Sequence, residues 1–378
     1  MDVVLPLRGE FHAKGRVSAR GNRFTYDEDL RVGKSDFTAA ITVLHAPTRP
    51  KISGRIQAGE LHLNDVALSD GDEKPGTAKD ASRAIPDHTI PTDIFLAADL
   101  DLAIGAERII TEAEPLGGWV SKVKLQDGRY HSSHSVSGVM GGRMVGELDI
   151  DAADQLPSVR VRLDARDLDY RLLQQLSRNS DLIEGRIELY VELSGAGATV
   201  RRLLGNADGR VTVIGGPGRI SGRSLELWAA DLIPTMLSPR WQRQNVTEMN
   251  CFVAHIGLKQ GLATVEDLIL DTQRITVAGG GMLNLETEAI DLLLAPRPKR
   301  PSFVSLANPV RIQGTLAEPD VSVARLPSRR RLMRTGLLAG LINPAFLLVA
   351  FSDTGTGVTN PCGAAIERAY EAAEIDAR

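Results

Sequence analysis

Apolar and polar residues alternate along most of this chain, in runs separated by short turns. Residues 187–193 read Ile-Glu-Leu-Tyr-Val-Glu-Leu, residues 159–165 read Val-Arg-Val-Arg-Leu-Asp-Ala, and residues 290–294 read Ile-Asp-Leu-Leu-Leu. A period of two places the apolar side chains of a strand on one face of a sheet and the polar ones on the other. The pattern therefore predicts a sheet with one long apolar face that must be covered, closed on itself or used.

Turn-forming residues and changes of composition divide the pattern into four segments. Residues 1–68 contain several β-rich runs, which predict an N-terminal segment of β-hairpins. Residues 69–91 are polar and rich in charge and turn formers, which predicts a flexible linker. Strands resume over residues 92–326, with helical inserts that include a short helix at 199–204. Beyond them the apolar spacing becomes helical, so residues 327–378 are predicted to form a helical C-terminal segment.

These segments predict a fold that is mainly β with helical inserts. We expect a long, curved antiparallel meander sheet that forms a groove with one apolar face and ends in a helical C-terminus. About twenty strands at about 4.8 Å spacing give an uninterrupted ribbon on the order of 100 Å long, and helical inserts shorten it. The alternative is a β-sandwich or barrel whose apolar faces pack on each other, and the alternation alone favours this packed form.

Composition and charge exclude some classes of partner. The 378 residues carry a formal net charge of −4, and aromatic residues make up 4% of them. Nucleic-acid-binding proteins usually present a basic field and aromatic side chains for stacking, so no nucleic-acid partner is predicted. The chain begins within the strand pattern and without the features of a signal peptide. We read it as an expression product or a piece of a longer protein, which leaves room for an N-terminal membrane anchor outside this sequence.

Two pairs of residues could carry special chemistry. Cys251 and Cys362 are the two cysteines of the chain, and an even count in an exported protein allows one disulfide bridge. The alternative is that both are small buried side chains. His131 and His134 are the one close pair among seven histidines. Because residues three apart in a strand point to opposite faces, they are not expected to share a metal ion.

No catalytic or cofactor-binding motif stands out. The glycine-rich stretches lack the Gly-Lys-Ser/Thr or Gly-x-Gly-x-x-Gly context of a phosphate site, and no Gly-x-Ser-x-Gly is present. A hydrolase that uses paired aspartates would need converging carboxylates, whereas alternating aspartates are simply typical of the wet face of a strand. We therefore predict a protein that is not an enzyme and has no catalytic, cofactor or metal site. The alternating aspartates are Asp99, Asp101, Asp149 and Asp151.

One basic cluster precedes the longest apolar stretch, residues 336–351. That stretch contains Asn343 and Pro344 and is shorter than a comfortable membrane span. Basic residues beside an apolar helix suit an anionic membrane surface. The commoner alternative is a solvated helix start ahead of a helix that packs under the sheet. The candidate membrane-surface residues are Arg329, Arg330, Arg331 and Arg334.

Four sequences follow one another in a distinctive order between residues 205 and 323. They are Gly-Arg-Val-Thr-Val-Ile-Gly-Gly-Pro-Gly-Arg-Ile-Ser-Gly from residue 209, Asn-Cys-Phe-Val-Ala-His-Ile-Gly-Leu-Lys-Gln-Gly-Leu-Ala from residue 250, Val-Ala-Gly-Gly-Gly-Met-Leu-Asn-Leu-Glu-Thr-Glu-Ala-Ile-Asp-Leu from residue 277, and Pro-Val-Arg-Ile-Gln-Gly-Thr-Leu-Ala-Glu-Pro-Asp-Val from residue 309. This order, closed by Gly-Thr-Leu-x-x-Pro, resembles the C-terminal region of the AsmA family of Gram-negative bacteria. The resemblance covers most of the chain from residue 92, and residues 1–68 fit it more loosely.

The resemblance implies an inner-membrane anchor, a periplasmic body, a role in outer-membrane biogenesis and a relation to proteins that move phospholipid along β-grooves. With it, an open groove is preferred over a packed sandwich. Burial of each acyl CH₂ group is worth about 0.8 kcal/mol, so a partly enclosed lipid tail is well held.

We therefore expect a non-catalytic protein at the periplasmic face of the bacterial inner membrane, which holds or transfers phospholipid or another acyl-chain lipid. Membrane and envelope proteins are the other expected partners. The alternative is an envelope interaction scaffold with a fully packed β-sandwich core. Glu188, Tyr190 and Glu192 are expected to face water. The candidate lipid-facing residues are Val161, Leu163, Leu189, Val191, Leu193, Leu292 and Leu294.

Overall fold

The computed structural model describes residues 11–66, 83–111, 115–139, 141–154, 156–169, 183–221, 246–273, 275–299, 309–323 and 361–374. Most of these residues lie in strands of an open sheet and few lie in helices, so the predicted fold class is confirmed. The chain divides into two compact units. The first contains residues 1–81, 88–165 and 196–200, and the second contains residues 82–87, 166–195 and 201–378. The domain boundaries predicted at residues 68, 92 and 326 stay predictions.

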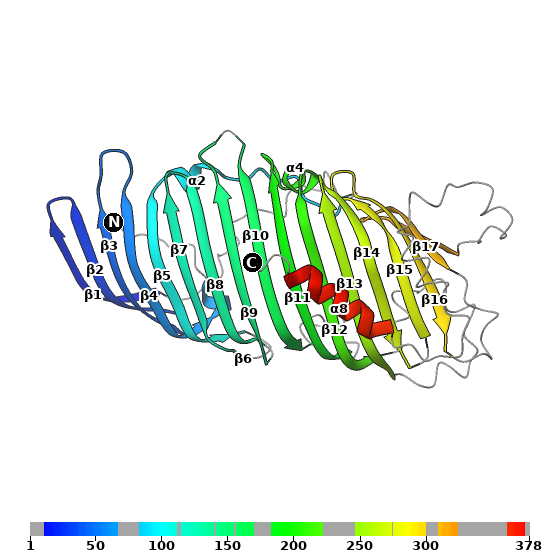
Figure 1. Ribbon diagram of the computed structural model, residues 1–378. Helices are drawn as coiled ribbons and strands as arrows, with labels where there is room; N and C mark the ends of the chain where they lie inside the picture. Colours follow the sequence, from blue (N-terminus) through cyan, green and yellow to red (C-terminus); the bar gives the residue numbers. More distant parts are fainter. Residues whose placement is uncertain are drawn as a thin grey trace. The chain divides into compact units, whose positions relative to one another are not determined.

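The first unit is built on strands that pair with their neighbours in sequence (Figure 1). Two of its hairpins turn at Gly21 and Gly128, whose φ angles are 60° and 79°, a conformation that glycine adopts without strain. A short strand, β6, pairs with the end of β5. The strands are β1 (Phe11–Arg20), β2 (Arg23–Val32), β3 (Ser35–Leu44), β4 (Lys51–His62), β5 (Asp99–Ile110), β6 (Pro115–Leu116), β7 (Trp119–Gln126), β8 (Arg129–Val139) and β9 (Gly142–Asp151).

One pairing in the first unit is parallel. Strand β4 lies parallel to β5, with Ile52 opposite Leu100 and Ile56 opposite Ile104. The predicted antiparallel meander is therefore interrupted by this one parallel pair among the described strands. A parallel pair needs a long crossover, because the chain must return to the end from which it started. The polar segment after β4 supplies that length, and it carries the short helices α1 (Leu63–Val66) and α2 (Asp93–Leu96).

Hydrogen bonds hold the described part of the crossover near Ala84 and Ile85. The backbone N–H groups of Ala84 and Ile85 donate to the two carboxylate oxygens of Glu288, at 2.8 and 3.0 Å, all within the second unit. The Arg201 guanidinium donates to the carbonyl oxygen of Ile85 at 3.0 Å. The hydrogen bond from Ala84, joined by that from Ile85, lowers the pKa of Glu288 although the side chain is only 1% exposed. Ala84 and Ile85, within the flexible linker predicted over 69–91, are thus held by Glu288 and Arg201, and the linker itself stays a prediction.

The second unit is an antiparallel series in which each strand from β11 to β18 pairs with the next. Strand β10 (Ser158–Asp169) begins in the first unit and ends in the second. The helix predicted at 199–204 is present as α4 (Val200–Gly205). The strands are β11 (Ile183–Ala196), β12 (Asp208–Ser221), β13 (Val246–Lys259), β14 (Leu262–Thr272), β15 (Ile275–Asn284), β16 (Ala289–Pro298), β17 (Val310–Thr315) and β18 (Pro319–Val323).

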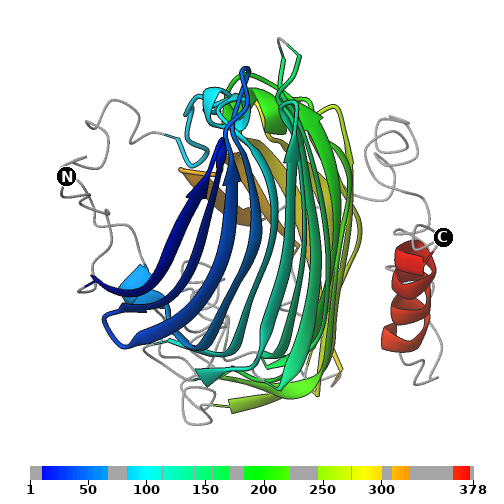
Figure 2. The same ribbon diagram turned by 90° about the vertical axis from the view of Figure 1, so that its left-hand side faces the viewer.

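A C-terminal helix, α8 (Pro361–Glu374), lies across strands β12 to β14. Proline suits the first turn of a helix, and the apolar residues that follow recur at helical spacing. Figure 2 shows the helix on the convex side of these bowed strands. It confirms a helix within the predicted C-terminal segment, while residues 324–360 lie outside the described residues. The core under the helix is formed by Ile214, Val253, Ile269, Ala365 and Ala369.

Candidate functional site

The face of the second unit opposite α8 carries uninterrupted rows of apolar residues. Strand alternation puts every second side chain on this face, and the antiparallel register brings those side chains side by side across the strands. One row crosses all eight strands without a polar side chain. Its members are Leu189, Val213, Ala254, Leu268, Gly279, Leu294, Val310 and Val323.

A second row runs beside the first and is equally apolar. Most side chains of the two rows are partly exposed, and Val323 at the last strand is 40% exposed. By contrast, Val253 on the opposite face is 0% exposed beneath α8. We call the two rows together the apolar face. The second row consists of Val191, Val211, Ile256, Val265, Gly281, Leu292, Ile312 and Val321.

Gly279 shows how closely the apolar face is filled by its own side chains. A Cβ atom at this position would lie 2.5 Å from Leu268 Cδ2 and 2.7 Å from Leu294 Cδ2. The two leucine side chains therefore lie over the glycine and make the surface continuous across three strands. Glycine in the middle of a strand is otherwise unfavourable, so its presence here is explained by this close approach.

The polar residues of β11 lie on the opposite face, as the alternation predicts, but two of them contact α8 rather than facing only water. Glu188 accepts hydrogen bonds from the hydroxyls of Tyr190 at 2.7 Å and Tyr370 at 2.9 Å. Burial, together with the bond to Glu188, raises the pKa of Tyr370 to about 12. The third, Glu192, accepts from Arg210 at 3.1 Å and remains partly exposed.

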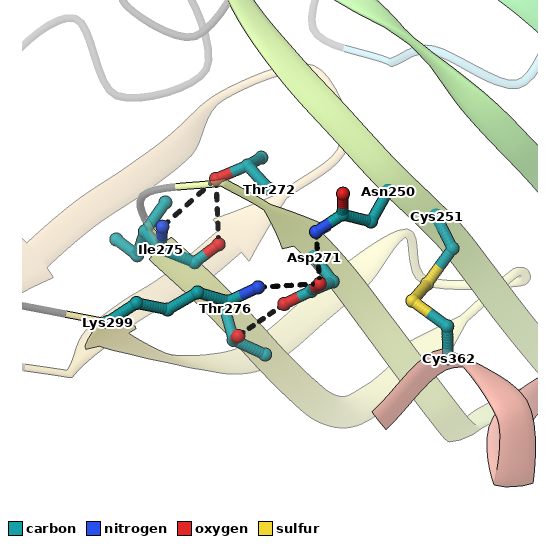
Figure 3. The surroundings of a disulfide bond; sticks show 8 residues. All are labelled: Asn250, Cys251, Asp271, Thr272, Ile275, Thr276, Lys299 and Cys362. Atoms are coloured by element: carbon teal, nitrogen blue, oxygen red, sulfur yellow. Dashed lines mark hydrogen bonds and ion pairs between the residues drawn. A yellow bond between two sulfur atoms is a disulfide. The ribbon is translucent and has the colours of Figure 1, made fainter. Parts of the chain in front are cut away.

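A disulfide fastens α8 to this face of the sheet. Cys251 of β13 and Cys362 in the first turn of the helix are bonded, with their Cα atoms 6.0 Å apart (Figure 3). Both side chains are buried. Of the two alternatives left open by the sequence, the structure therefore has the bridge. The prediction that such a bridge belongs to an oxidising compartment stays a prediction.

A buried carboxylate lies beside the bridge, since Asp271 is the register partner of Cys251. Its side chain is 2% exposed and accepts hydrogen bonds from Lys299 Nζ at 2.8 Å, from Asn250 Nδ2 at 2.7 Å and from the hydroxyl of Thr276 (Figure 3). Burial works to raise the pKa of Asp271, but these bonds, led by that from Lys299, outweigh it and lower the pKa. The network explains how an ionised group is accommodated beneath the outer surface of the sheet.

The first unit has an apolar face of the same kind, but polar side chains interrupt it. In the register, Ile104 of β5, Ser121 of β7, His134 of β8 and Gly146 of β9 lie in one row. The row beside it contains Ser132 of β8. Strand β8 has polar residues at both alternating sets of positions, and this break in the pattern is the signal that could have revealed them from the sequence.

The predicted lipid-facing residues fall into two groups. Leu189, Val191, Leu292 and Leu294 lie on the apolar face of the second unit, and Leu193 follows them along β11. Val161 and Leu163 lie in the part of β10 that belongs to the first unit and are partly exposed. Whether any of these residues contacts lipid stays a prediction.

The candidate acid–base and metal residues do not converge. His131 lies on the polar face and contacts Asp149, with Nδ1 2.7 Å from a carboxylate oxygen, whereas His134 lies on the apolar side. Asp151 accepts from Arg129 at 3.1 Å. In the part of the chain that the structure describes, no three His, Cys, Asp or Glu residues are grouped to hold a metal ion. The candidate membrane-surface residues Arg329, Arg330, Arg331 and Arg334 lie outside the described residues.

Comparison with known proteins places this sheet in context. The chain matches the family model described as "AsmA family" over residues 23–268. It is 23% identical over 385 residues to "AsmA family protein YhjG" of Escherichia coli (strain K12), covering 95% of this chain and 56% of that protein. The chain thus spans little more than half the length of this curated relative. No solved structure matches it. Among the described helices, none has the length and apolar character needed to cross a bilayer.

Proposed function

Because the chain belongs to the AsmA family, we propose that it holds phospholipid or another acyl-chain lipid on its apolar face and acts at the periplasmic face of the inner membrane. Membership of the family itself indicates a role in the cell envelope and in outer-membrane assembly. Two of the four sequences that carry the resemblance, at 209–222 and 250–263, lie within the region that the family model matches, residues 23–268. Lipid binding, the location and any transfer between membranes go beyond what membership indicates.

One observation carries the proposal: two adjacent apolar rows cross eight strands of the second unit, and most of their side chains are partly exposed. Soluble proteins rarely leave contiguous apolar surface uncovered unless it binds something. An acyl chain matches it chemically, since each CH₂ group removed from water contributes about 0.8 kcal/mol. The rows contain no donor or acceptor side chain that would orient a polar ligand.

The alternative, an envelope scaffold with a packed sandwich core, requires a second layer against this face. In the described part of the second unit the covering element, α8, packs on the opposite face, over Ile214, Val253 and Ile269. This arrangement favours the lipid-holding function over the scaffold.

The test is to purify the protein without detergent, extract it and identify copurifying lipids by mass spectrometry. Wild type is expected to carry stoichiometric phospholipid, and a variant with Leu189→Asp and Leu292→Asp is expected to lose it. Ser322→Asp, on the exposed opposite face of β18, is the matched control and should retain lipid. If the double aspartate variant loses its far-ultraviolet circular dichroism spectrum, Leu189→Ser with Leu292→Ser replaces it. Absence of lipid from wild type, or full retention in folded variants, would contradict the proposal.

A further inference from the structure

The polar side chains on the apolar side of the first unit form a compact group, which we call the polar island: Trp119, Ser121, Ser132 and His134. Ser121 and His134 are register partners across β7 and β8. The rings of Trp119 and His134 are stacked, with centroids 6.3 Å apart and planes 10° from parallel. His134 Nε2 lies 2.9 Å from Ser132 Oγ, a hydrogen bond in which either group can donate.

The polar island has unused hydrogen-bonding capacity. Ser121 is 1% exposed, and its buried Oγ has no hydrogen-bond partner in the part of the chain that the structure describes. A buried hydroxyl is normally paired, because leaving it unpaired costs free energy. Among the described residues, the ring atoms Trp119 Nε1 and His134 Nδ1 also lack a partner. The polar island therefore holds three polar atoms with free hydrogen-bonding capacity, and the Ser121 hydroxyl is the buried one.

The surroundings of the polar island are apolar and uncharged. Its register partners include Ile104 and Ala106 on β5, Val136 on β8 and Leu148 on β9. Further along β5 the charged Arg108 is paired with Glu60, so neither presents an uncompensated charge. Burial lowers the pKa of His134, which keeps the imidazole neutral near pH 7. Such a site suits an uncharged acceptor better than a phosphate or a carboxylate.

On the side of β9, the residue next to the polar island has no side chain. Gly146, the register partner of His134, presents no side chain. A Cβ atom there would lie 3.5 Å from the Arg162 carbonyl oxygen and 3.6 Å from Leu163 Cδ1, which is ordinary contact. Because Ser121 is 1% exposed, a ligand reaches its hydroxyl only when neighbouring side chains move, and the proposal includes this movement.

From this arrangement we propose that the polar island binds the acyl carbonyl of a lipid whose hydrocarbon chain lies along the neighbouring apolar residues. The carbonyl is the first polar atom at the end of an esterified acyl chain, it is uncharged, and it accepts from the Ser121 hydroxyl and Trp119 Nε1–H. The inference rests on the proposed function and deepens it, because it states which chemical group of the lipid is recognised and where.

The experiment offers the full chain an equal mixture of two phosphatidylethanolamines with identical chains, one ester-linked and one ether-linked. The protein is reisolated and the bound ratio is measured by mass spectrometry. Wild type is expected to favour the ester lipid by about threefold to tenfold, the value of one or two net hydrogen bonds. Ser121→Ala and Trp119→Phe, which keeps an aromatic ring but removes the Nε1–H donor, should each lower the ratio, and the two changes together should bring it close to one. Ser135→Ala, on the exposed opposite face of β8, should leave it unchanged.

The outcomes separate the two proposals. Equal binding of both lipids by wild type overturns the carbonyl site but leaves lipid binding standing. An ester preference that is undiminished in both island variants also overturns it. Binding of neither lipid refutes the proposed function itself.

Discussion

A pair of identical substitutions distinguishes an open apolar face from a packed one. Val253 and Val191 are both valines within strands of the second unit, on opposite faces of the sheet. Val253 is 0% exposed and belongs to the core under α8, whereas Val191 is partly exposed on the apolar face. Replacement of each valine with alanine removes the same two carbon atoms, so any difference in cost reports the surroundings.

The expected magnitudes follow from burial. At about 0.8 kcal/mol for each buried carbon, Val253→Ala loses about 1.6 kcal/mol of transfer free energy, and the cavity left behind adds about 1 kcal/mol. The total is about 2–3 kcal/mol. Val191→Ala removes atoms that are already partly in water and leaves no closed cavity, so the loss should stay below about 1 kcal/mol. The lower β-propensity of alanine affects both variants and cancels in the comparison.

The assay is urea unfolding followed by far-ultraviolet circular dichroism, supported by hydrogen exchange of amides in β11 to β14. Two compact units can unfold in separate transitions, but both valines lie in the second unit and report on the same one. An equal cost for the two variants, at 2 kcal/mol or more, would refute the reasoning. It would mean that the apolar face is covered and that the packed scaffold is the better description.

Three further predictions concern the outer face and the polar island. Cys362→Ser opens a covalent loop of 111 residues, and the chain-entropy model puts the loss of unfolding free energy at about 5 kcal/mol. The double variant Cys251→Ala with Cys362→Ala should lose no more unfolding free energy than either single variant. An additive loss would contradict the bridge. Asp271→Asn should destabilise by about 1–3 kcal/mol in urea unfolding. The pKa of Asp271 is lowered in the folded protein. The carboxylate therefore contributes to the unfolding free energy above the unfolded pKa of about 4, and this contribution is lost as the pH falls through the folded pKa. An unfolding free energy that is equally pH-dependent below about pH 5 in wild type and in Asp271→Asn would count against this. Ser121→Ala should leave the unfolding free energy unchanged or raise it by up to about 1 kcal/mol, since it removes an unpaired buried hydroxyl. A loss of unfolding free energy above about 1 kcal/mol, measured by thermal unfolding, would show that the hydroxyl has a partner.

Strand alternation predicted the faces of the sheet well, because the two-residue period is a local property of the backbone. Leu189 and Val191 fall on the apolar face and Glu188 on the other, as their spacing requires. Pairing between strands is not local in this sense. Nothing in the alternation of β4 or β5 distinguishes a parallel neighbour from an antiparallel one, so the parallel pair was missed. Only the long polar segment between them could have indicated a crossover.

The placement of α8 was not predicted, although the sequence holds a clue to it. Cys251 alternates with Phe252, whose side chain lies on the same face as Leu270. A bridge from Cys251 therefore requires Cys362, and the helix that starts beside it, to lie on the opposite, more polar face. The polar island escaped prediction for another reason. Its members are brought together by register between strands, and an unpaired hydroxyl such as Ser121 Oγ is visible only when every neighbour is placed.

The position of α8 bears directly on what the apolar face is for. Burial of apolar area is the main stabilising term in folding. A helix with its own apolar stripe would therefore contribute most to stability if it covered the more apolar face of the sheet. In the described part of the second unit the chain does the opposite. It fastens α8 by a disulfide to the face that carries Glu188, Asp271 and their hydrogen bonds. That arrangement stabilises the sheet from outside while the two apolar rows keep partial exposure. The proposed function accounts for this partial exposure, because an acyl chain laid on the two rows would cover them and has the matching chemistry.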